Sequence, residues 1–458
     1  RTSGMANFTK RLNANHTLFG ELLYSESKLV SRIAAPPVDI PIGTSSPFYS
    51  VPASLGYQDN VTVRWRMWDA ANRTTQDVGK ATHFAFGSKG NMAGWDYNAA
   101  LTHSQNKWTE TYVAGWLKSN ELLAALTAGT LNPFVEPGKQ SAAGLATIAG
   151  AVYNGVYKSA DTGLTMLDLK ASRELFNAPG GAAMVAVGAD YRRESNSYSP
   201  SDIAQAKGNV IAGDSAEERP YDLSRNSWGA FAEVAVPVTK SFELTGALRH
   251  DRYSDIGGTT NYKLAGRWQP TKQIMVRGSV GSGFKAPSIA QASSINQLYG
   301  VTGGSYSCPF AAADALAKFC VPGSTQYNVF AEGTPSLKPE KSQQFNLGIR
   351  LEPSPMASIG LDYWAINLKD RIGQLDESVI FGNPVTYRHL YTTYTDPTSG
   401  ATNLAILLKN ENLGEQKTSG LDLDVALRFK TGLGTWTSQA LATYLIKNQY
   451  QRERNGAY

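Results

Sequence analysis

Hydrophobic and polar residues alternate along this chain with a period of two, which is typical of β-strands with one apolar and one polar face. In one segment Phe345, Leu347 and Ile349 share a face, while Asn346 and Arg350 share the opposite one. The polar face carries charged residues in segment after segment. The alternation is clearest over residues 95–102, 261–268, 344–352 and 421–430. We therefore predict long strands that each meet two different environments.

The connections between the predicted strands are alternately short and long. Tight joints are predicted at residues 13–15, 92–94, 177–181, 237–241, 269–272, 352–355 and 431–434. Longer connections are predicted at residues 34–60, 115–160, 197–222, 286–339 and 372–404, with one short exception at 255–258. Strands joined in this way run up and down, with turns at one end and loops at the other, as in outer-membrane barrels. With two strands for each tight joint, the chain holds about fourteen long strands.

Two segments depart from this pattern of long strands. Residues 61–72 form either an extra hairpin among the long loops or the outer end of the next strand. The sequence NELLAALTAG in another loop predicts a helix that Ser119 caps and Gly129 ends, with Pro133 beyond it. We expect this helix to pack over the loops.

The strand predicted at residues 274–284 ends in an unusual way, in the sequence RGSVGSGFKAPSIAQ. Its length matches the nine to eleven residues that a tilted strand needs to cross a bilayer. At its far end Phe284 suits an aromatic girdle, Gly281 and Gly283 let the backbone bend, and Pro287 ends the ladder. The strand is predicted to stop where the hydrocarbon layer stops.

A soluble β-sandwich is the main alternative, because its strands also alternate. Two features disfavour it: the predicted strands are longer than the usual five or six residues, and the connections sort by length. Hydropathy does not decide between the two folds. The mean hydropathy of −0.29 fits either one, since only every second residue of a barrel strand meets lipid.

Composition narrows the choice of environment and partner. Charged residues make up 18% of the chain, below the roughly 25% usual in soluble domains. No apolar run reaches the length of a transmembrane helix. The net charge of +5 is not gathered into Lys/Arg tracts, which disfavours nucleic acid as a partner. Cys308 and Cys320 are the only cysteines and predict a loop-closing disulfide in an oxidising compartment, with two unpaired thiols as the alternative.

We find no constellation of residues that predicts an enzyme or a metal site. The HExxH, GxSxG and phosphate-loop motifs are absent, and no dinucleotide fingerprint occurs. The five histidines, His16, His83, His103, His250 and His389, are scattered along the chain. Charged residues on the polar face are instead predicted to line the interior of a barrel. The candidates are Glu233, Arg249 and Asp251, read as a network between adjacent strands, together with Arg277.

The order of several motifs makes the chain similar to a known family. Residues 248–291, LRHDRYSDIGGTTNYKLAGRWQPTKQIMVRGSVGSGFKAPSIAQ, closely resemble the TonB-dependent receptors. His250 stands where that family usually has Tyr, and Lys285 where it usually has Arg. Further matches follow in PSLKPEKSQQFNLGIRLEP, LDYWAINLKDRIG and NLGEQKTSGLDLDVAL. The resemblance runs in order through residues 227–450, with a looser match earlier in GWDYNAALTHSQNKW.

The resemblance implies an all-β, antiparallel up-and-down transmembrane barrel with long extracellular loops. Members of the family have 22 strands, an N-terminal plug inside the barrel, and a short box that contacts TonB. We expect residues 1–458 to be part of the barrel domain, without the plug, the TonB box and the final C-terminal strands. The implied location is the bacterial outer membrane, with its lipid around the barrel.

The function that the resemblance implies is energised uptake of a scarce, large solute such as a ferric siderophore, cobalamin, a glycan or a peptide. Energy would come through TonB with ExbB and ExbD, and no resident cofactor is implied. Aromatic residues of the long loops are candidate ligand contacts. They are Tyr299, Tyr306, Tyr391 and Tyr394. A passive porin or a barrel adhesin is the alternative, and a soluble carbohydrate-binding or hydrolytic β protein is a third reading.

Overall fold

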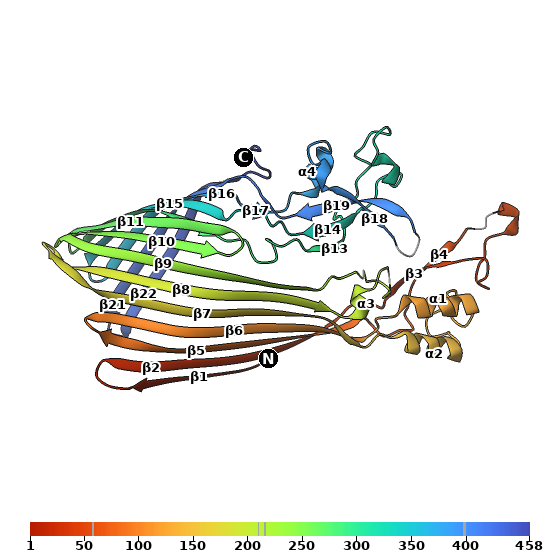
Figure 1. Cartoon of the computed structure of the whole chain (residues 1–458), viewed down its shortest axis with the longest axis horizontal. Coiled ribbons are helices and arrows are strands. Elements are labelled where there is room, and N and C mark those ends of the chain that lie inside the picture. Colours follow the sequence, from red (N-terminus) through yellow and green to blue (C-terminus); the bar gives the residue numbers. More distant parts are fainter. Residues whose placement is uncertain (57–58, 209, 215–216, 397–399) are drawn as a thin grey trace.

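A computed structural model describes residues 1–56, 59–208, 210–214, 217–396 and 400–458. Within these residues, fourteen strands form one antiparallel sheet in the order β1-β2-β5-β6-β7-β8-β9-β10-β11-β12-β15-β16-β21-β22. Each strand pairs with its neighbours in this order, as expected for up-and-down strands, and β1 and β22 form the two edges. Figure 1 shows the sheet curving, so that β21 and β22 pass behind the front strands.

The fourteen strands are long, and their bounds agree closely with the alternating pattern. They are β1 Thr2–Arg11, β2 His16–Arg32, β5 Thr74–Met92, β6 Trp95–Ala114, β7 Gly155–Ala178, β8 Gly181–Pro200, β9 Tyr221–Thr239, β10 Phe242–Tyr253, β11 Gly257–Thr271, β12 Ile274–Lys285, β15 Glu340–Ser354, β16 Ala357–Lys369, β21 Gln416–Thr431 and β22 Gly434–Tyr450. All seven predicted tight joints are turns between neighbouring strands. The turns lie at one end of the sheet and the helices and short strands at the other (Figure 1).

The two faces of the sheet differ in chemistry. On one face, Val280 of β12 lies opposite Leu264 of β11 and Phe345 of β15. These three side chains are 41%, 53% and 45% exposed, respectively. The opposite face is polar and hollowed: a cavity of about 230 Å³ is lined by residues that include Glu243, Lys263, Arg267, Arg277 and Asn346. A continuous apolar surface of this kind is typical of a face that lipid or another protein covers.

One group of loops packs around its own apolar core at the loop end. The strands β3 Pro37–Ile42 and β4 Val61–Arg66 pair with each other, so residues 61–66 form the extra hairpin, the first of the two alternatives. The helices α1 Ser119–Ala128 and α2 Ala142–Ala151 lie beside this hairpin (Figure 1). Val38, Leu122 and Ile148 are among the buried residues they share.

The predicted helix is present as α1, but its N-cap was wrong and other helices were missed. Gly129 ends α1 with a φ of 77°, as expected. The N-cap, however, is Lys118, and Ser119 is already the first helical residue. The pattern missed α2, whose N-cap Ser141 accepts a hydrogen bond from the backbone of Gly144. It also missed two shorter helices, α3 Asp202–Gln205 and α4 Glu377–Gly382.

Two further loops, residues 286–339 and 370–415, fold together into a unit that we call the two-loop cap. Its four-stranded sheet has the order β13-β14-β19-β18, with β13 Asn296–Val301, β14 Asn328–Glu332, β18 Tyr391–Thr395 and β19 Thr402–Lys409. The strands β14 and β19 come from different loops and pair in parallel. A smaller pair joins β17 Ile372–Gly373 to β20 Glu411–Asn412.

The two-loop cap has a buried core and a covalent link. Residues buried together include Tyr327, Ile380, Leu404 and Ile406. Cys308 and Cys320 form a disulfide with a Cα–Cα distance of 5.5 Å. The cap also contains the short 3-10 helices η2 Ala317–Phe319 and η3 Arg388–Leu390, whereas η1 Ala53–Leu55 lies outside it, between β3 and β4. The cap is therefore a folded unit, and not a set of independent loops.

Candidate functional site

A large hollow lies between the β8–β9 connection and the two-loop cap. We call this hollow the loop cavity; its volume is about 890 Å³. That size falls within the range typical of small-molecule sites, about 300–1,000 Å³. Its lining consists of Lys158, Tyr198, Gly208, Gly213, Asp214, Glu218, Tyr221, residues 297–301, Asn328, Ala331, Tyr394 and Asp396.

One wall of the loop cavity is built from the outer ends of β7, β8 and β9. The carboxylate of Glu218 accepts hydrogen bonds from Lys158 Nζ at 3.0 Å and from Tyr198 Oη at 2.7 Å. The rings of Tyr198 and Tyr221 are stacked, with centroids 5.5 Å apart. Asp214 accepts a hydrogen bond of 2.7 Å from Tyr112 Oη. Strand ends and loop are thus fixed to each other by charged and aromatic contacts.

The other wall is the outer surface of the two-loop cap. The β13–β14 register shifts between Leu298 and Gly300, which leaves Tyr299 without a paired residue. Such a bulge turns a side chain away from the regular ladder. Gly300 has a φ of 122°, a conformation that glycine adopts without strain. The result is a tyrosine side chain that is 74% exposed at the rim of the loop cavity.

The two walls are joined directly. The amide of Gln297 donates to the backbone carbonyl of Arg219 and its carbonyl accepts from the Arg219 backbone N–H. Tyr394 Oη donates to Glu217 Oε1 at 3.0 Å. Burial and this carboxylate both raise the pKa of Tyr394 above its ordinary value, so the phenol stays protonated and remains a donor at neutral pH.

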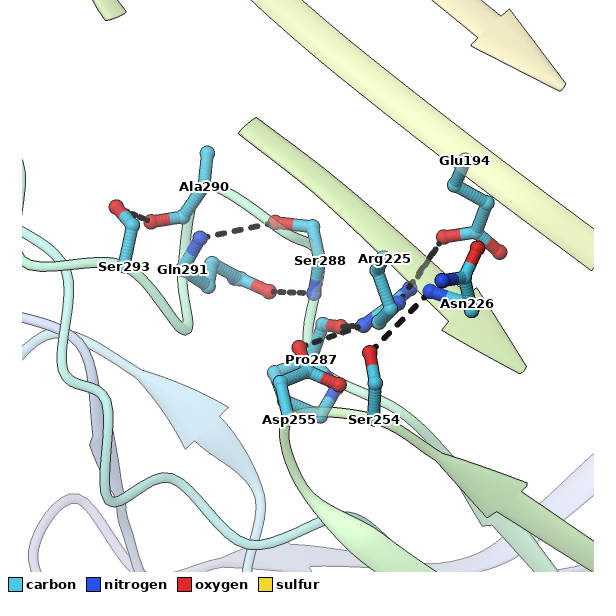
Figure 2. A network of polar contacts seen from close by, with 10 residues as sticks. All are labelled: Glu194, Arg225, Asn226, Ser254, Asp255, Pro287, Ser288, Ala290, Gln291 and Ser293. Carbon is cyan, nitrogen blue, oxygen red and sulfur yellow. Dashed lines mark hydrogen bonds and ion pairs between the residues drawn. The ribbon is translucent and has the colours of Figure 1, made fainter. Parts of the chain in front are cut away.

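A buried arginine holds the start of the 286–339 loop against the main sheet. Arg225 of β9 is 6% exposed, and its guanidinium donates to Glu194 at 2.5 Å and to the carbonyl of Pro287 at 2.8 Å (Figure 2). It also pairs with Asp255 at 3.6 Å and lies 4.9 Å from the ring centroid of Tyr253. Three other chain segments, at Glu194, residues 253–255 and Pro287, therefore converge on this one side chain of β9.

The segment after Pro287 is stabilised by its own hydrogen bonds. Ser288 and Gln291 bond each other reciprocally, each backbone N–H donating to the other side chain, at 3.0 and 3.2 Å. Ser293 Oγ donates to the carbonyl of Ala290 (Figure 2). β13 begins shortly afterwards, at Asn296. The contacts of Arg225 therefore help to position the cap wall of the loop cavity.

The four tyrosines predicted as ligand contacts have two different environments. Tyr299 and Tyr394 line the loop cavity. Tyr306 stacks on Phe381 at a centroid distance of 4.1 Å, and burial raises the pKa of its phenol. Tyr391 is only 8% exposed and donates to the carbonyl of Ile380. In this structure Tyr306 and Tyr391 pack within the two-loop cap, because the two loops share a core that local sequence does not reveal.

The predicted interior residues lie on the polar face of the main sheet. Arg249 donates to Asp190 at 2.8 Å and to Asp251 at 2.6 Å. Glu233 lies opposite Ala247 in the register and is not among the partners that the structure gives Arg249. Arg277 forms a bidentate pair with Asp362, at 3.0 and 2.7 Å. Sequence reasoning missed Asp190 and Asp362 because each lies two strands away from its arginine.

The described part of the chain contains neither a metal site nor a membrane-spanning helix. No group of three or more His, Cys, Asp or Glu side chains there has a geometry that holds a metal ion. None of the helices found in the described ranges has both the length and the hydropathy required to span a bilayer.

The comparisons with known proteins agree on one family. The family model "TonB dependent receptor-like, beta-barrel" matches residues 31–457. The comparison with curated proteins gave no match.

Similar solved structures support the same fold. The siderophore receptor PirA from Acinetobacter baumannii has 14% identity and a TM-score of 0.58, with 97% of this chain and 52% of that chain covered. A mutant of the ferric enterobactin receptor PfeA from Pseudomonas aeruginosa, solved with enterobactin, has 15% identity and a TM-score of 0.58, with 97% and 51% covered. The FrpB iron transporter from Neisseria meningitidis has 12% identity and a TM-score of 0.53, with 98% and 53% covered.

These findings confirm the predicted antiparallel barrel fold and its fourteen long strands. The chain spans about half the length of the solved structures it matches. The family model, in contrast, matches nearly all of this chain. The chain therefore belongs to the TonB-dependent receptor β-barrel family, whose members are transporters of the bacterial outer membrane and not enzymes.

Proposed function

We propose that this protein takes up a scarce, large solute across the outer membrane, with energy supplied through TonB. The observation that carries the proposal is the position of the loop cavity. It lies at the loop end of a sheet with the family fold, between the two-loop cap and the outer ends of β7, β8 and β9. A solute captured there would be next to the polar face of the barrel, which supplies charged and hydrogen-bonding groups such as Arg249 and Arg277.

A ferric siderophore is the solute class we favour. The solved structures with the same fold include a siderophore receptor, a ferric enterobactin receptor and an iron transporter. Their identity to this chain is low, so they support the general class of solute and not a particular compound. The loop cavity of about 890 Å³ has room for a ligand of that size.

The proposed partners follow from the family. TonB, with ExbB and ExbD, would supply energy from the inner membrane, and outer-membrane lipid would cover the apolar face that includes Val280 and Phe345. We propose that the native receptor also has a plug inside the barrel and a TonB box, since the matched structures are about twice as long as this chain.

Uptake of radioactive iron by cells that carry the intact gene tests this proposal. A host without its own siderophore receptors would be supplied with ferric siderophores, in the presence or absence of TonB. We expect saturable uptake that disappears without TonB. Uptake that continues without TonB and rises linearly with concentration would instead indicate a passive pore.

Two matched variants connect uptake to the loop cavity. Tyr299→Ala removes an exposed aromatic side chain from the cavity rim, and Trp68→Ala removes one from a loop outside the lining; they are 74% and 60% exposed. We expect the first variant to raise the solute concentration needed for half-maximal uptake, and the second to leave it unchanged. If the two variants need the same solute concentration for half-maximal uptake, the solute is captured at a site other than the loop cavity.

A further inference from the structure

The charged groups that line the loop cavity are mainly acidic. Among the described lining residues, the carboxylates belong to Asp214, Glu218 and Asp396, and the single cationic side chain is Lys158. No arginine is present in that lining. A concave surface lined mainly by one sign of charge concentrates ions of the opposite sign and repels those of the same sign.

The single lysine is already engaged. Lys158 Nζ lies 3.0 Å from Glu218 Oε1, and both side chains are about one-quarter exposed or less, at 24% and 21%. Glu218 also accepts the hydrogen bond from Tyr198 Oη. An anionic ligand would therefore have to compete with Glu218 for Lys158, and it would gain no second cation from the described lining.

Two charged side chains that bond to groups beside the lining, Arg73 and Glu217, do not reverse this balance. Arg73 donates to the backbone carbonyl of Gly213 at 3.2 Å, which places one cation behind that wall. Glu217 accepts from Tyr394 and places one anion beside it. These two side chains offset each other, so the excess of carboxylates in the lining remains.

The uncharged groups of the lining suit a ligand with hydrogen-bond donors or positive charge. Four tyrosines, Tyr198, Tyr221, Tyr299 and Tyr394, belong to the lining, and the rings of Tyr198 and Tyr221 stack on each other. Ring faces attract cations, because the aromatic quadrupole is negative above and below the ring. Carboxylates only accept hydrogen bonds, so they pair with ligand hydroxyl, amide or ammonium groups.

We infer that the loop cavity selects a solute whose outer surface is neutral or cationic and rich in hydrogen-bond donors, and that it disfavours a solute with an anionic surface. This inference rests on the proposed uptake function, and it specifies the chemical class of the ferric complex. A ferric trihydroxamate that carries a free ammonium group fits the description. A ferric tris-catecholate, which carries three negative charges, does not.

Equilibrium binding to the purified full-length receptor in detergent tests the inference. The two probes are a cationic ferric trihydroxamate and an anionic ferric tris-catecholate, measured at low and at high salt. We expect the cationic complex to bind roughly tenfold tighter or more, with the difference shrinking at high salt. Asp396→Lys should reduce this preference roughly tenfold, and Asp396→Asn should reduce it less. Asp59→Lys adds the same charge in a loop outside the lining and should leave it unchanged.

The outcomes separate this inference from the proposed function. If the anionic complex binds as tightly as the cationic one, or if Asp396→Lys and Asp59→Lys behave alike, the charge selection is wrong, while uptake of a ferric complex still stands. If neither ferric complex binds to a receptor that migrates as a folded barrel, the proposed solute class is wrong and this inference fails with it.

Discussion

The guanidinium of Arg277 on β12 bonds both carboxylate oxygens of Asp362 on β16, although the whole of β15 runs between the two strands. The residue in between is Gly348, which pairs with Arg277 on one side and with Asp362 on the other. A Cβ atom at this position would lie 2.0 Å from Asp362 Oδ1. Because glycine has no side chain, the ion pair can pass over the middle strand at Gly348.

The same arrangement occurs a second time on the polar face. Arg249 of β10 reaches Asp190 of β8 across Gly229 of β9. A Cβ atom on Gly229 would lie 2.2 Å from Arg249 Nη2. Two glycines in middle strands therefore allow arginines to link strands that are not neighbours.

Substitution of Gly348 should weaken the barrel wall. Gly348→Val places a branched side chain where the Arg277–Asp362 pair lies, so we expect the free energy of unfolding to fall by roughly 1–3 kcal/mol, mostly from crowding. The lost ion pair itself adds little, because the Arg277 side chain is 54% exposed and solvent screens the pair. Urea unfolding in detergent micelles, followed by tryptophan fluorescence, measures the change.

Gly360 offers a matched control for this experiment. It also lies in a middle strand, between Arg350 and Asp424, but the nearest atom to an added Cβ is 3.8 Å away. Gly360→Ala should therefore change the stability by much less than Gly348→Ala. Equal losses for the two alanine variants would mean that the cost comes from adding a Cβ atom to a strand glycine generally, and not from crowding against the Arg277–Asp362 pair.

The orientation of the sheet gives a second prediction. Val280 lies near the middle of β12 on the apolar face, and its neighbour Ser279 lies on the polar face beside Asn346. Val280→Arg should cost roughly 2–4 kcal/mol, because it places a charge near the middle of the bilayer. Ser279→Arg should cost much less. Refolding into lipid vesicles measures both variants, and a larger loss for Ser279→Arg would reverse the assigned faces.

The sequence was sufficient to predict the long strands because each one carries its own local signal. In β12 the alternation, the tight turn before it and Pro287 after it together gave nearly the observed bounds, Ile274–Lys285. The two-loop cap was not predictable in this way. Its parallel pairing places Val329 beside Ile406, in another loop, and no local pattern reports such a contact. This is why Tyr306 and Tyr391 looked like free loop aromatics.

The ion-pair partner of a charged residue was harder to predict than the face of the sheet on which that residue lies. Alternation predicts Arg249 and Arg277 on the polar side, and in the structure each forms an ion pair with an aspartate. Choosing their partners requires the register between strands, and the contacts here skip one strand altogether. The carboxylates therefore could not be chosen without knowing where Gly229 and Gly348 lie between them.

The position of Arg225 leads to a third prediction, which concerns how firmly residues 286–295 are attached to the main sheet. Arg225→Ala leaves Glu194 and Asp255 without their buried partner and removes the donor to Pro287. We expect roughly 3–5 kcal/mol of destabilisation for an interaction of this kind. Limited proteolysis should show faster cleavage within residues 286–295, because this segment loses its attachment to the main sheet.

Two further variants distinguish a specific role of Arg225 from a general loss of charge. Arg225→Lys keeps the charge but loses the planar fork that serves Glu194 and Pro287 together, so we expect only partial rescue. Arg219→Ala removes an exposed arginine nearby whose bonds to Gln297 use only its backbone. If Arg219→Ala accelerates cleavage as much as Arg225→Ala does, the attachment does not depend on Arg225.

The fourth prediction concerns the effect of acid on the two-loop cap. Two ion pairs join its loops: Arg388 with Asp314 at 2.6 Å, and Lys409 with Glu332 at 3.0 Å. The hydrogen bond from Arg388 lowers the pKa of Asp314 from its ordinary 3.8. For Glu332, burial acts to raise the pKa, but hydrogen bonds from Asn296 and Lys409 outweigh it and lower the pKa from its ordinary 4.5.

A carboxyl group with a lowered pKa in the folded state stabilises that state above its ordinary pKa, and this contribution disappears as the pH falls through the lowered value. The cap should therefore be fully stable at about pH 6 and loosen below about pH 4. Hydrogen exchange of β14 and β19, corrected for the intrinsic pH dependence of exchange, measures this. The double variant Asp314→Asn, Glu332→Gln should already exchange faster at about pH 6 and change less on acidification. An unchanged acid response in that variant would assign the sensitivity to other groups.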